Sequence, residues 1–193
     1  MWSSRAWHEH QRYITGPDAQ WAIGQLRQRG VTYEAMLAAY MPGGARIRVP
    51  NKGFWLPDEN GKPAVLLPVV AGILMHENGV DREPIVADIL AFDPAKPAEW
   101  GLRYNESGVA LGGDNLERCG RHGMADFEIT LYPDPLAWLK AGARGAVLLK
   151  GRECRNLILD VPRLICATPK VAAEVDQIIR SGDLAWPEIR VAV

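Results

Sequence analysis

Leu131-Tyr-Pro-Asp-Pro-Leu-Ala-Trp-Leu-Lys-Ala-Gly-Ala-Arg-Gly-Ala-Val-Leu-Leu149 is the stretch that decides the fold class. Its pattern predicts a strand, a turn, a short helix and a second strand, because Asp134 can cap a helix that Pro135 begins and Gly142 ends. Strand-to-helix corners are where α/β proteins tend to place binding and catalytic groups. The stretch therefore raises the question whether residues 132–134 form an active-site corner.

A second strand-to-helix corner follows within residues 163–182. Thr168 precedes a proline, as the aspartate does at the first corner. An apolar stripe that includes Val171 and Val175 predicts a helix that covers a sheet. Two such units imply right-handed βαβ crossovers and a partly parallel sheet, so we expect residues 126–193 to form an α/β half.

The chain before this half divides into two further segments. Residues 1–46 contain a predicted pair of helices within 18–41, joined by a tight Arg-Gly-Val turn. Residues 47–125 change to short apolar runs separated by Asn-Gly-type turns, which is typical of an antiparallel β meander. Glycine-rich residues 112–124 predict a loop between the halves. The expected class is α/β (α+β), with the meander and residues 126–193 packed as one compact unit.

The composition predicts a globular protein without a membrane segment. The chain has 193 residues and 48% hydrophobic content, which is enough for one sizeable core. Its longest apolar run, residues 64–75, contains a proline and a glycine and is too short to span a bilayer as a helix. The N-terminus lacks the apolar region of a secretion signal, and three cysteines are an odd number that suits reduced thiols. We therefore expect a cytoplasmic location.

Basic residues gather ahead of an aromatic pair in the first predicted strands. The formal net charge of −1 gives no overall attraction to nucleic acid, but it leaves room for a local patch. Arg46, Arg48 and Lys52 precede Trp55, and basic and aromatic side chains together can hold a single strand by phosphate contact and base stacking. The other interpretation is a solvated strand face that leads into buried aromatic residues.

A second basic cluster comes just after the opening stretch. Lys150, Arg152 and Arg155 lie in the half that would carry a site, and they are further candidates for contact with nucleic acid. The helix pair within residues 18–41 is a weaker candidate for a DNA-reading helix-turn-helix. Its second helix has no basic side chain to meet phosphate or guanine.

Asp134 has a structural and a chemical interpretation. As a helix cap it would satisfy unpaired backbone donors. As a general base or a magnesium ligand it would need a second carboxylate, and Asp160 is the nearest candidate. The chemical interpretation predicts a metal-dependent phosphotransfer enzyme or nuclease that uses Mg²⁺.

Cys119 and His122 have a spacing that could supply two zinc ligands. Cys154, Cys166 or the His8–His10 pair would have to complete a site of four. The other interpretation is a loop cysteine and a surface histidine. We expect no metal site and no cofactor.

Common nucleotide-binding and hydrolase motifs are absent from the sequence. There is no Gly-x-x-x-x-Gly-Lys-Ser/Thr loop, no Gly-x-Gly-x-x-Gly after a strand and no Gly-x-Ser-x-Gly elbow. The usual signatures of nucleotide hydrolysis, dinucleotide chemistry and α/β-hydrolase chemistry are therefore missing.

Three segments, in chain order, resemble the catalytic core of bacterial and phage DNA primases and the primase-like Toprim proteins of phages and mobile elements. Leu26-Arg-Gln-Arg-Gly-Val-Thr-Tyr-Glu-Ala-Met36 is similar to their helix junction. Asn60-Gly-Lys-Pro-Ala-Val-Leu-Leu-Pro-Val-Val70, with residues 85–92, is similar to their paired strands. The opening stretch then falls where the Toprim fold has its first strand, helix and second strand. The resemblance implies a Toprim-like α/β half and a role in DNA replication.

The departures from that family concern its metal-holding acids. A catalytic Toprim site has Glu-Gly at the end of its first strand, where this chain has Tyr132-Pro133, and Asp-x-Asp after a later strand, where it has residues 167–169, Ala-Thr-Pro. The resemblance therefore implies the fold without the reaction.

The sequence predicts a non-catalytic, primase-like protein of phage or mobile-element origin. Its partner would be single-stranded DNA or a replication protein. Two alternatives stay open: the metal-dependent enzyme using Asp134 and Asp160, and a protein-interaction or inhibitor module. An exposed apolar patch on the meander or around Trp2 and Trp7 would favour the module.

Overall fold

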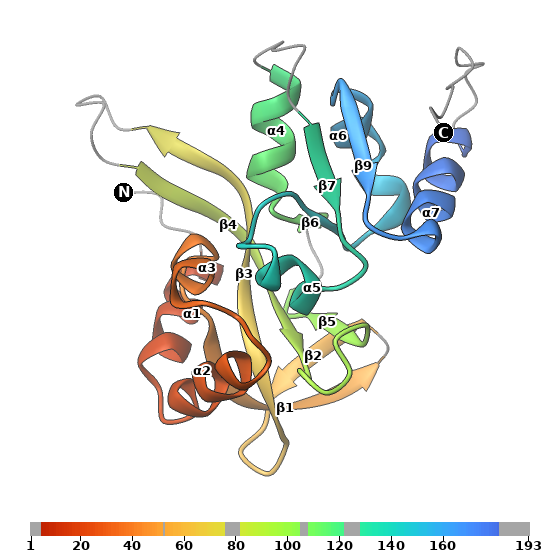
Figure 1. Ribbon diagram of the computed structural model, residues 1–193. Helices are drawn as coiled ribbons and strands as arrows, with labels where there is room; N and C mark the ends of the chain where they lie inside the picture. Colours follow the sequence, from red (N-terminus) through yellow and green to blue (C-terminus); the bar gives the residue numbers. More distant parts are fainter. Residues whose placement is uncertain (1–4, 52, 76–81, 105–107, 122–127, 182–193) are drawn as a thin grey trace.

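The computed structural model describes residues 5–51, 53–75, 82–104, 108–121 and 128–181 (Figure 1). The chain is a mixed α/β protein whose sheets are partly parallel, as the sequence predicted. Figure 1 shows α1, α2 and α3 on one side of the long β3–β4 pair, with β7, β9, α6 and α7 grouped on the other side. Within the described residues, no helix is both long and apolar enough to cross a membrane.

Three helices begin the described chain: α1 (Arg5–Thr15), α2 (Ala19–Gln28) and α3 (Tyr33–Ala38). The predicted pair corresponds to α2 and α3, and Thr32 caps α3 by accepting a hydrogen bond of 3.2 Å from the Ala35 N–H. The sequence prediction missed α1. Its buried side consists of Ala6 and His10, which do not form a recognisable apolar stripe.

The predicted meander is instead a closed barrel of five strands, in the order β1-β2-β5-β4-β3. The pairs β1–β2, β1–β3, β3–β4 and β4–β5 are antiparallel, but β2 and β5 pair in parallel, with Phe54 opposite Leu102. Register shifts near Val70 on the β3–β4 pair mark bulges, which bend strands and allow a sheet to curl. Local turn signals could not show this closing contact. The strands are β1 (Gly43–Asn51), β2 (Phe54–Pro57), β3 (Lys62–Met75), β4 (Arg82–Phe92) and β5 (Trp100–Leu102).

Helix α1 packs against the apolar cluster that fills the barrel. Residues from β1 to β4 form this cluster together with Ala6 of α1, and Trp7 and Tyr13 pack against it. Trp55 is fully buried there, its indole N–H donates to the Ile89 carbonyl at 3.0 Å, and its ring meets Tyr13 edge-on at 6.1 Å. Alternate positions of β3 belong to a second cluster with α2, α3 and α5. Both faces of β3 are therefore buried.

The remaining elements form the α/β half. Strands β7 and β9 pair in parallel, β6 and β8 pair antiparallel, and a parallel bridge joins Leu131 to Ala146. Both predicted caps are confirmed: Asp134 accepts from the Ala137 N–H at 2.8 Å, and Thr168 accepts from Val171 at 3.3 Å. The elements are β6 (Ala110–Leu111), α4 (Gly113–Arg121), β7 (Glu128–Leu131), α5 (Pro135–Lys140), β8 (Val147–Leu148), η1 (Gly151–Cys154), α6 (Arg155–Leu159), β9 (Arg163–Cys166) and α7 (Pro169–Arg180).

The loop predicted over residues 112–124 was wrong, because α4 occupies Gly113–Arg121. The glycines had suggested irregular backbone, but Gly112 lies just ahead of the helix, with a φ of 70°. A Cβ at that position would lie 2.3 Å from the Gly145 carbonyl oxygen. Glycine is needed there for close approach, and the helix that follows buries Leu116 completely.

His10 makes the stability of this fold dependent on pH. The side chain is fully buried, neither ring nitrogen has a hydrogen-bond partner among the described residues, and burial lowers the pKa of His10 from 6.5 to about 4. The unfolded chain therefore takes up a proton near pH 6.5 that the folded chain takes up only near pH 4. The stability that this neutral histidine contributes is complete above pH 6.5 and is lost progressively as pH falls from 6.5 through 4.

We expect the free energy of unfolding to fall by about 2 kcal/mol between pH 7.5 and pH 5.0 on account of this residue. Urea denaturation at the two pH values measures the change. His10→Phe keeps a ring beside Trp7 and removes the titrating group, so its unfolding free energy should change less over this range. An equal pH dependence in the two proteins would show that His10 is not its source.

Candidate functional site

The corner at residues 132–134 is built as a helix start. The Asp134 carboxylate is used in capping α5, and the Tyr132 N–H donates to the Ala146 carbonyl at 2.9 Å. Asp160 lies exposed at the C-terminal end of α6. Among the described residues, no group of three or more histidine, cysteine or acidic side chains could hold a metal ion. The structure therefore gives Asp134 the structural role that the sequence had offered as one of two.

The proposed zinc ligands are not brought together where the structure describes them. His8 is exposed and His10 is buried, since residues two apart face different sides of a helix. Cys154 is buried and its thiol donates to the Val109 carbonyl at 2.9 Å, while burial raises the pKa of that thiol. Burial likewise raises the pKa of Cys166. The Cys119 side chain and His122 lie outside the described residues.

The predicted basic strand is exposed, but its aromatic partner is not. Arg46 donates to the Gly61 carbonyl at 3.2 Å, and Arg48 lies 3.5 Å from the Asp58 carboxylate. Both arginines are on the outer face of β1. Trp55 was expected to stack on a base, and this expectation needs correction because the ring is 0% exposed. Lys52 lies outside the described residues.

The second basic cluster serves the packing of the α/β half. Lys150 lies 3.8 Å from Glu153, with only 13% of its side chain exposed. Arg155 is half-buried, and its Nε donates to the Ile179 carbonyl at 3.3 Å, which ties α6 to α7. The Arg152 side chain lies outside the described part of the chain. Of this cluster, the described side chains Lys150 and Arg155 are therefore less open than the sequence suggested.

A different basic surface lies on α1, and we call it the α1 hollow. Arg5, His8, Glu9 and Arg12 come from one face of α1, since positions three, four and seven apart share a side of a helix. Arg103, which follows β5, completes the lining. Arg5, His8 and Arg12 are exposed, and Glu9 is the one acid among these five described side chains.

Glu9 is already neutralised within the protein. Its carboxylate accepts hydrogen bonds from the Tyr13 hydroxyl at 2.8 Å, from Arg103 Nε at 2.9 Å and from the Tyr104 hydroxyl. Burial alone would raise the pKa of Glu9, but these three donors outweigh burial and lower it. Burial and the Glu9 hydrogen bond raise the pKa of Tyr104 to about 12. Arg5 lies over the Tyr104 ring at 5.0 Å and is exposed, so it adds positive charge to the surface of the α1 hollow.

Asp88 fixes the segment that carries Arg103 and Tyr104. This aspartate is fully buried on β4, and its Oδ1 accepts from the N–H groups of Ile89, Arg103 and Tyr104 at 2.7, 2.9 and 3.0 Å. The buried Asp88 therefore orients Arg103 and Tyr104, and these two residues in turn orient Glu9.

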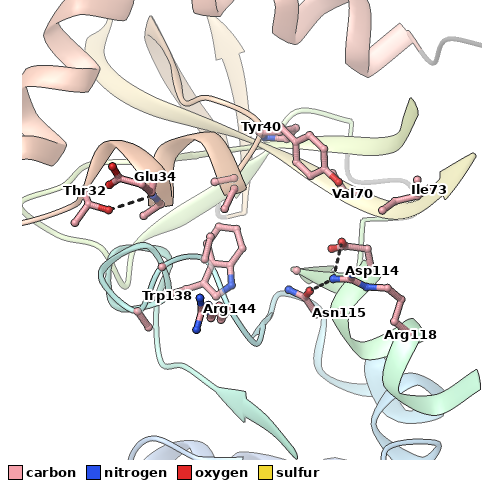
Figure 2. A pocket seen from close by; sticks show the side chains of 18 residues that line it. Thr32, Glu34, Tyr40, Val70, Ile73, Asp114, Asn115, Arg118, Trp138 and Arg144 are labelled. Carbon is pink, nitrogen blue, oxygen red and sulfur yellow. Dashed lines mark hydrogen bonds and ion pairs between the residues drawn. The ribbon is translucent and has the colours of Figure 1, made fainter. Parts of the chain in front are cut away.

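A cleft of about 450 Å³ lies between the N-terminal helices and the α/β half (Figure 2). Its lining comes from α3, β3, the start of α4, and α5 with the loop after it. Figure 2 shows Tyr40 on one side of the cleft, Trp138 on the other, and Asp114, Asn115 and Arg118 together at one end. The sequence prediction missed this site because four separate segments contribute to it.

Exposed apolar side chains do not form a broad patch on the described surface. Tyr33 and Leu37, 56% and 51% exposed, lie one turn apart on α3, while Val49 and Ile85 are on different strands. Trp7 is half-buried against the barrel cluster, and Trp2 lies outside the described residues. The protein-interaction module therefore stays an untested alternative.

No protein-family model, curated protein or solved structure matches this chain. The candidate sites therefore rest on the structure alone. Of the two candidates that the sequence prediction missed, the α1 hollow had a recognisable signal in the helical spacing of Arg5, His8 and Arg12. The cleft had none, because its residues meet only in the folded chain.

The two aspartates weighed as catalytic should differ in their effect on stability. Asp134→Ala removes a side-chain cap and should lower the free energy of unfolding by about 1 kcal/mol, as measured by urea denaturation. Asp160→Ala is the matched control. It removes an exposed acid from the negative end of a helix, so stability should stay within about 0.5 kcal/mol of the unmodified protein. Equal losses in the two variants would contradict the capping role.

Proposed function

We propose that this chain is a non-catalytic, primase-like protein of phage or mobile-element origin that binds single-stranded DNA through the α1 hollow. The observation that carries the proposal is a set of exposed cations, Arg5, His8 and Arg12, beside an acid that is already neutralised internally. Backbone phosphates supply most of the sequence-independent affinity for nucleic acid. Guanidinium groups suit them because they donate two parallel hydrogen bonds.

The spacing along α1 suits an extended strand. Arg5 and Arg12 are separated by roughly 10 Å along the helix axis, at 1.5 Å per residue. Different phosphates of one strand can therefore meet the two guanidinium groups. Arg5 lies over the Tyr104 ring at 5.0 Å, a contact that helps to hold its guanidinium group at this surface.

Two observations support a binding role over a reaction. The Asp134 carboxylate is used in capping α5, and the residues at the positions of the family's metal-holding acids are Tyr132-Pro133 and Ala-Thr-Pro over 167–169. The resemblance to Toprim proteins is the basis for the family and for a role in DNA replication. No observation favours the metal-dependent alternative that uses Asp134 with Asp160.

Neutralising the α1 hollow should weaken DNA binding and reduce its salt dependence. We expect the double variant Arg5→Gln with Arg12→Gln to bind a fluorescein-labelled oligothymidylate at least tenfold more weakly at 50 mM salt. The slope of log affinity against log salt should fall by about 1.4, since each phosphate contact to a single strand contributes about 0.7. Fluorescence anisotropy at several salt concentrations measures both quantities.

The matched control is Arg163→Gln with Arg180→Gln, which changes two exposed arginines of β9 and α7 that form surface ion pairs. Its affinity should stay within twofold of the unmodified protein. A third variant, Arg46→Gln with Arg48→Gln, tests the strand that the sequence suggested. A larger loss there than on α1 would move the interface to β1. Absence of binding at 50 mM salt would refute the nucleic-acid role.

A further inference from the structure

Tyr40 occupies a backbone position that the chain elsewhere fills with glycine. Helices α2, α3 and α5 all end in the same turn, in which the second residue after the C-cap donates to the carbonyl three residues before the C-cap. In α3 this bond runs from Met41 to Met36 at 2.8 Å. The left-handed position just after the C-cap is Gly30 in α2 and Gly142 in α5, with φ of 84° and 80°, but it is Tyr40 in α3, with φ of 59°.

A residue with a Cβ is unusual at this left-handed backbone position. The left-handed region is unfavourable for residues with a Cβ, and such residues concentrate at functional sites. The Tyr40 side chain lines the cleft, and its hydroxyl points toward Asp114 in Figure 2. This hydroxyl has no hydrogen-bond partner among the described residues. Burial and the nearby Asp114 carboxylate both raise the pKa of Tyr40, so the hydroxyl keeps its proton and stays available as a donor or an acceptor.

Two opposite charges lie side by side below Tyr40. Asp114 Oδ2 and Arg118 Nη2 are 3.8 Å apart, and their side chains are 13% and 58% exposed. Asn115 holds the guanidinium in place, since its Oδ1 accepts from Arg118 at 2.6 Å and its Nδ2 donates to the Gly145 carbonyl at 3.0 Å. The end of the cleft therefore offers a carboxylate, a guanidinium and a hydroxyl close together.

The side chains that line the cleft carry balanced charges, which disfavours ligands of high net charge. Two acids, Glu34 and Asp114, face two arginines, Arg118 and Arg144. The backbone N–H groups of Asp114 and Asn115 already interact with the Asp114 carboxylate, so the start of α4 is not an open phosphate site. A polyanion would lie against the two acids, and a simple cation would lie against the two arginines. A ligand with no net charge and one group of each sign fits best.

Apolar side chains make up part of the cleft lining. They are Ala35, Ala39, Val70, Ile73 and Trp138. The volume of about 450 Å³ is within the range of small-molecule sites. An apolar body attached to a zwitterionic head would therefore meet both kinds of surface in the cleft.

We propose that the cleft binds a free α-amino acid with an apolar side chain. Its ammonium group would contact Asp114 and the Tyr40 hydroxyl, its carboxylate would contact Arg118, and its side chain would lie against the apolar part of the lining. An α-amino acid carries its two charges on adjacent groups, as the Asp114–Arg118 pair does. This inference does not rest on DNA binding, because the α1 hollow and the cleft share no lining residue.

Calorimetric titration of the full chain with L-phenylalanine, L-leucine and L-methionine, each up to 10 mM, tests the proposal. We expect saturable binding of at least one. The corresponding amide, which lacks the carboxylate, and the N-acetyl derivative, which lacks the ammonium group, should each bind at least tenfold more weakly. No saturable heat with any of the three, or equal binding of a derivative, overturns the proposal.

Two variants and a control locate the site. Tyr40→Phe removes only the hydroxyl, and Arg118→Gln removes the cation; each should weaken binding at least fivefold while the melting temperature stays within a few degrees. Arg180→Gln changes an exposed arginine of α7 that does not line the cleft and should leave affinity within twofold. Unchanged binding in both Tyr40→Phe and Arg118→Gln would place the ligand elsewhere and refute the assignment. DNA binding by both variants should be unaltered, which separates this test from that of the α1 hollow.

Discussion

The carboxylate of Glu9 determines how α1 sits on the barrel. It is largely buried, and a buried charge is tolerated only when several donors compensate for the lost water. Tyr13 of the same helix and Arg103 and Tyr104 of the barrel supply those donors. Asp88 fixes the backbone of Arg103 and Tyr104, so hydrogen bonds connect the buried strand β4 through Glu9 to α1. The orientation of the exposed cations on α1 depends on these hydrogen bonds.

Three carboxylates stabilise separate parts of the fold. Asp88 anchors the chain after β5, Glu9 anchors α1, and Asp134 begins α5. Each carboxylate accepts hydrogen bonds that the protein itself provides. Asp114 differs, because it faces a cleft beside a cation and a tyrosine hydroxyl. The fold thus separates these three structural acids from an acid that lines a cleft.

Local chemistry made several elements predictable. Asp134-Pro135 and Thr168-Pro169 identified two helix starts, because a capping side chain and proline act within a single turn. Helix α4 escaped prediction because its glycines suggested a loop, and α1 escaped because alanine and a histidine form its buried side. Barrel closure escaped because Phe54 and Leu102 are far apart in the chain. The burial of Trp55 was not predicted for a related reason, because its ring becomes buried only when the barrel closes.

The sequence by itself determined the order of helices and strands at both corners and the partly parallel pairing in the α/β half, and it offered helix capping as one of two roles for Asp134. The corners depend on contacts within a few residues, where side-chain type and backbone geometry suffice, and the parallel pairing follows from the handedness of strand–helix–strand connections. Only the tertiary structure decided which basic residues are open: Arg155 became part of the packing, while Arg5 and Arg12 stayed at the surface. It also brought Tyr40 to Asp114. Such contacts depend on how distant segments pack, and packing is settled by the burial of the whole core rather than by any local pattern.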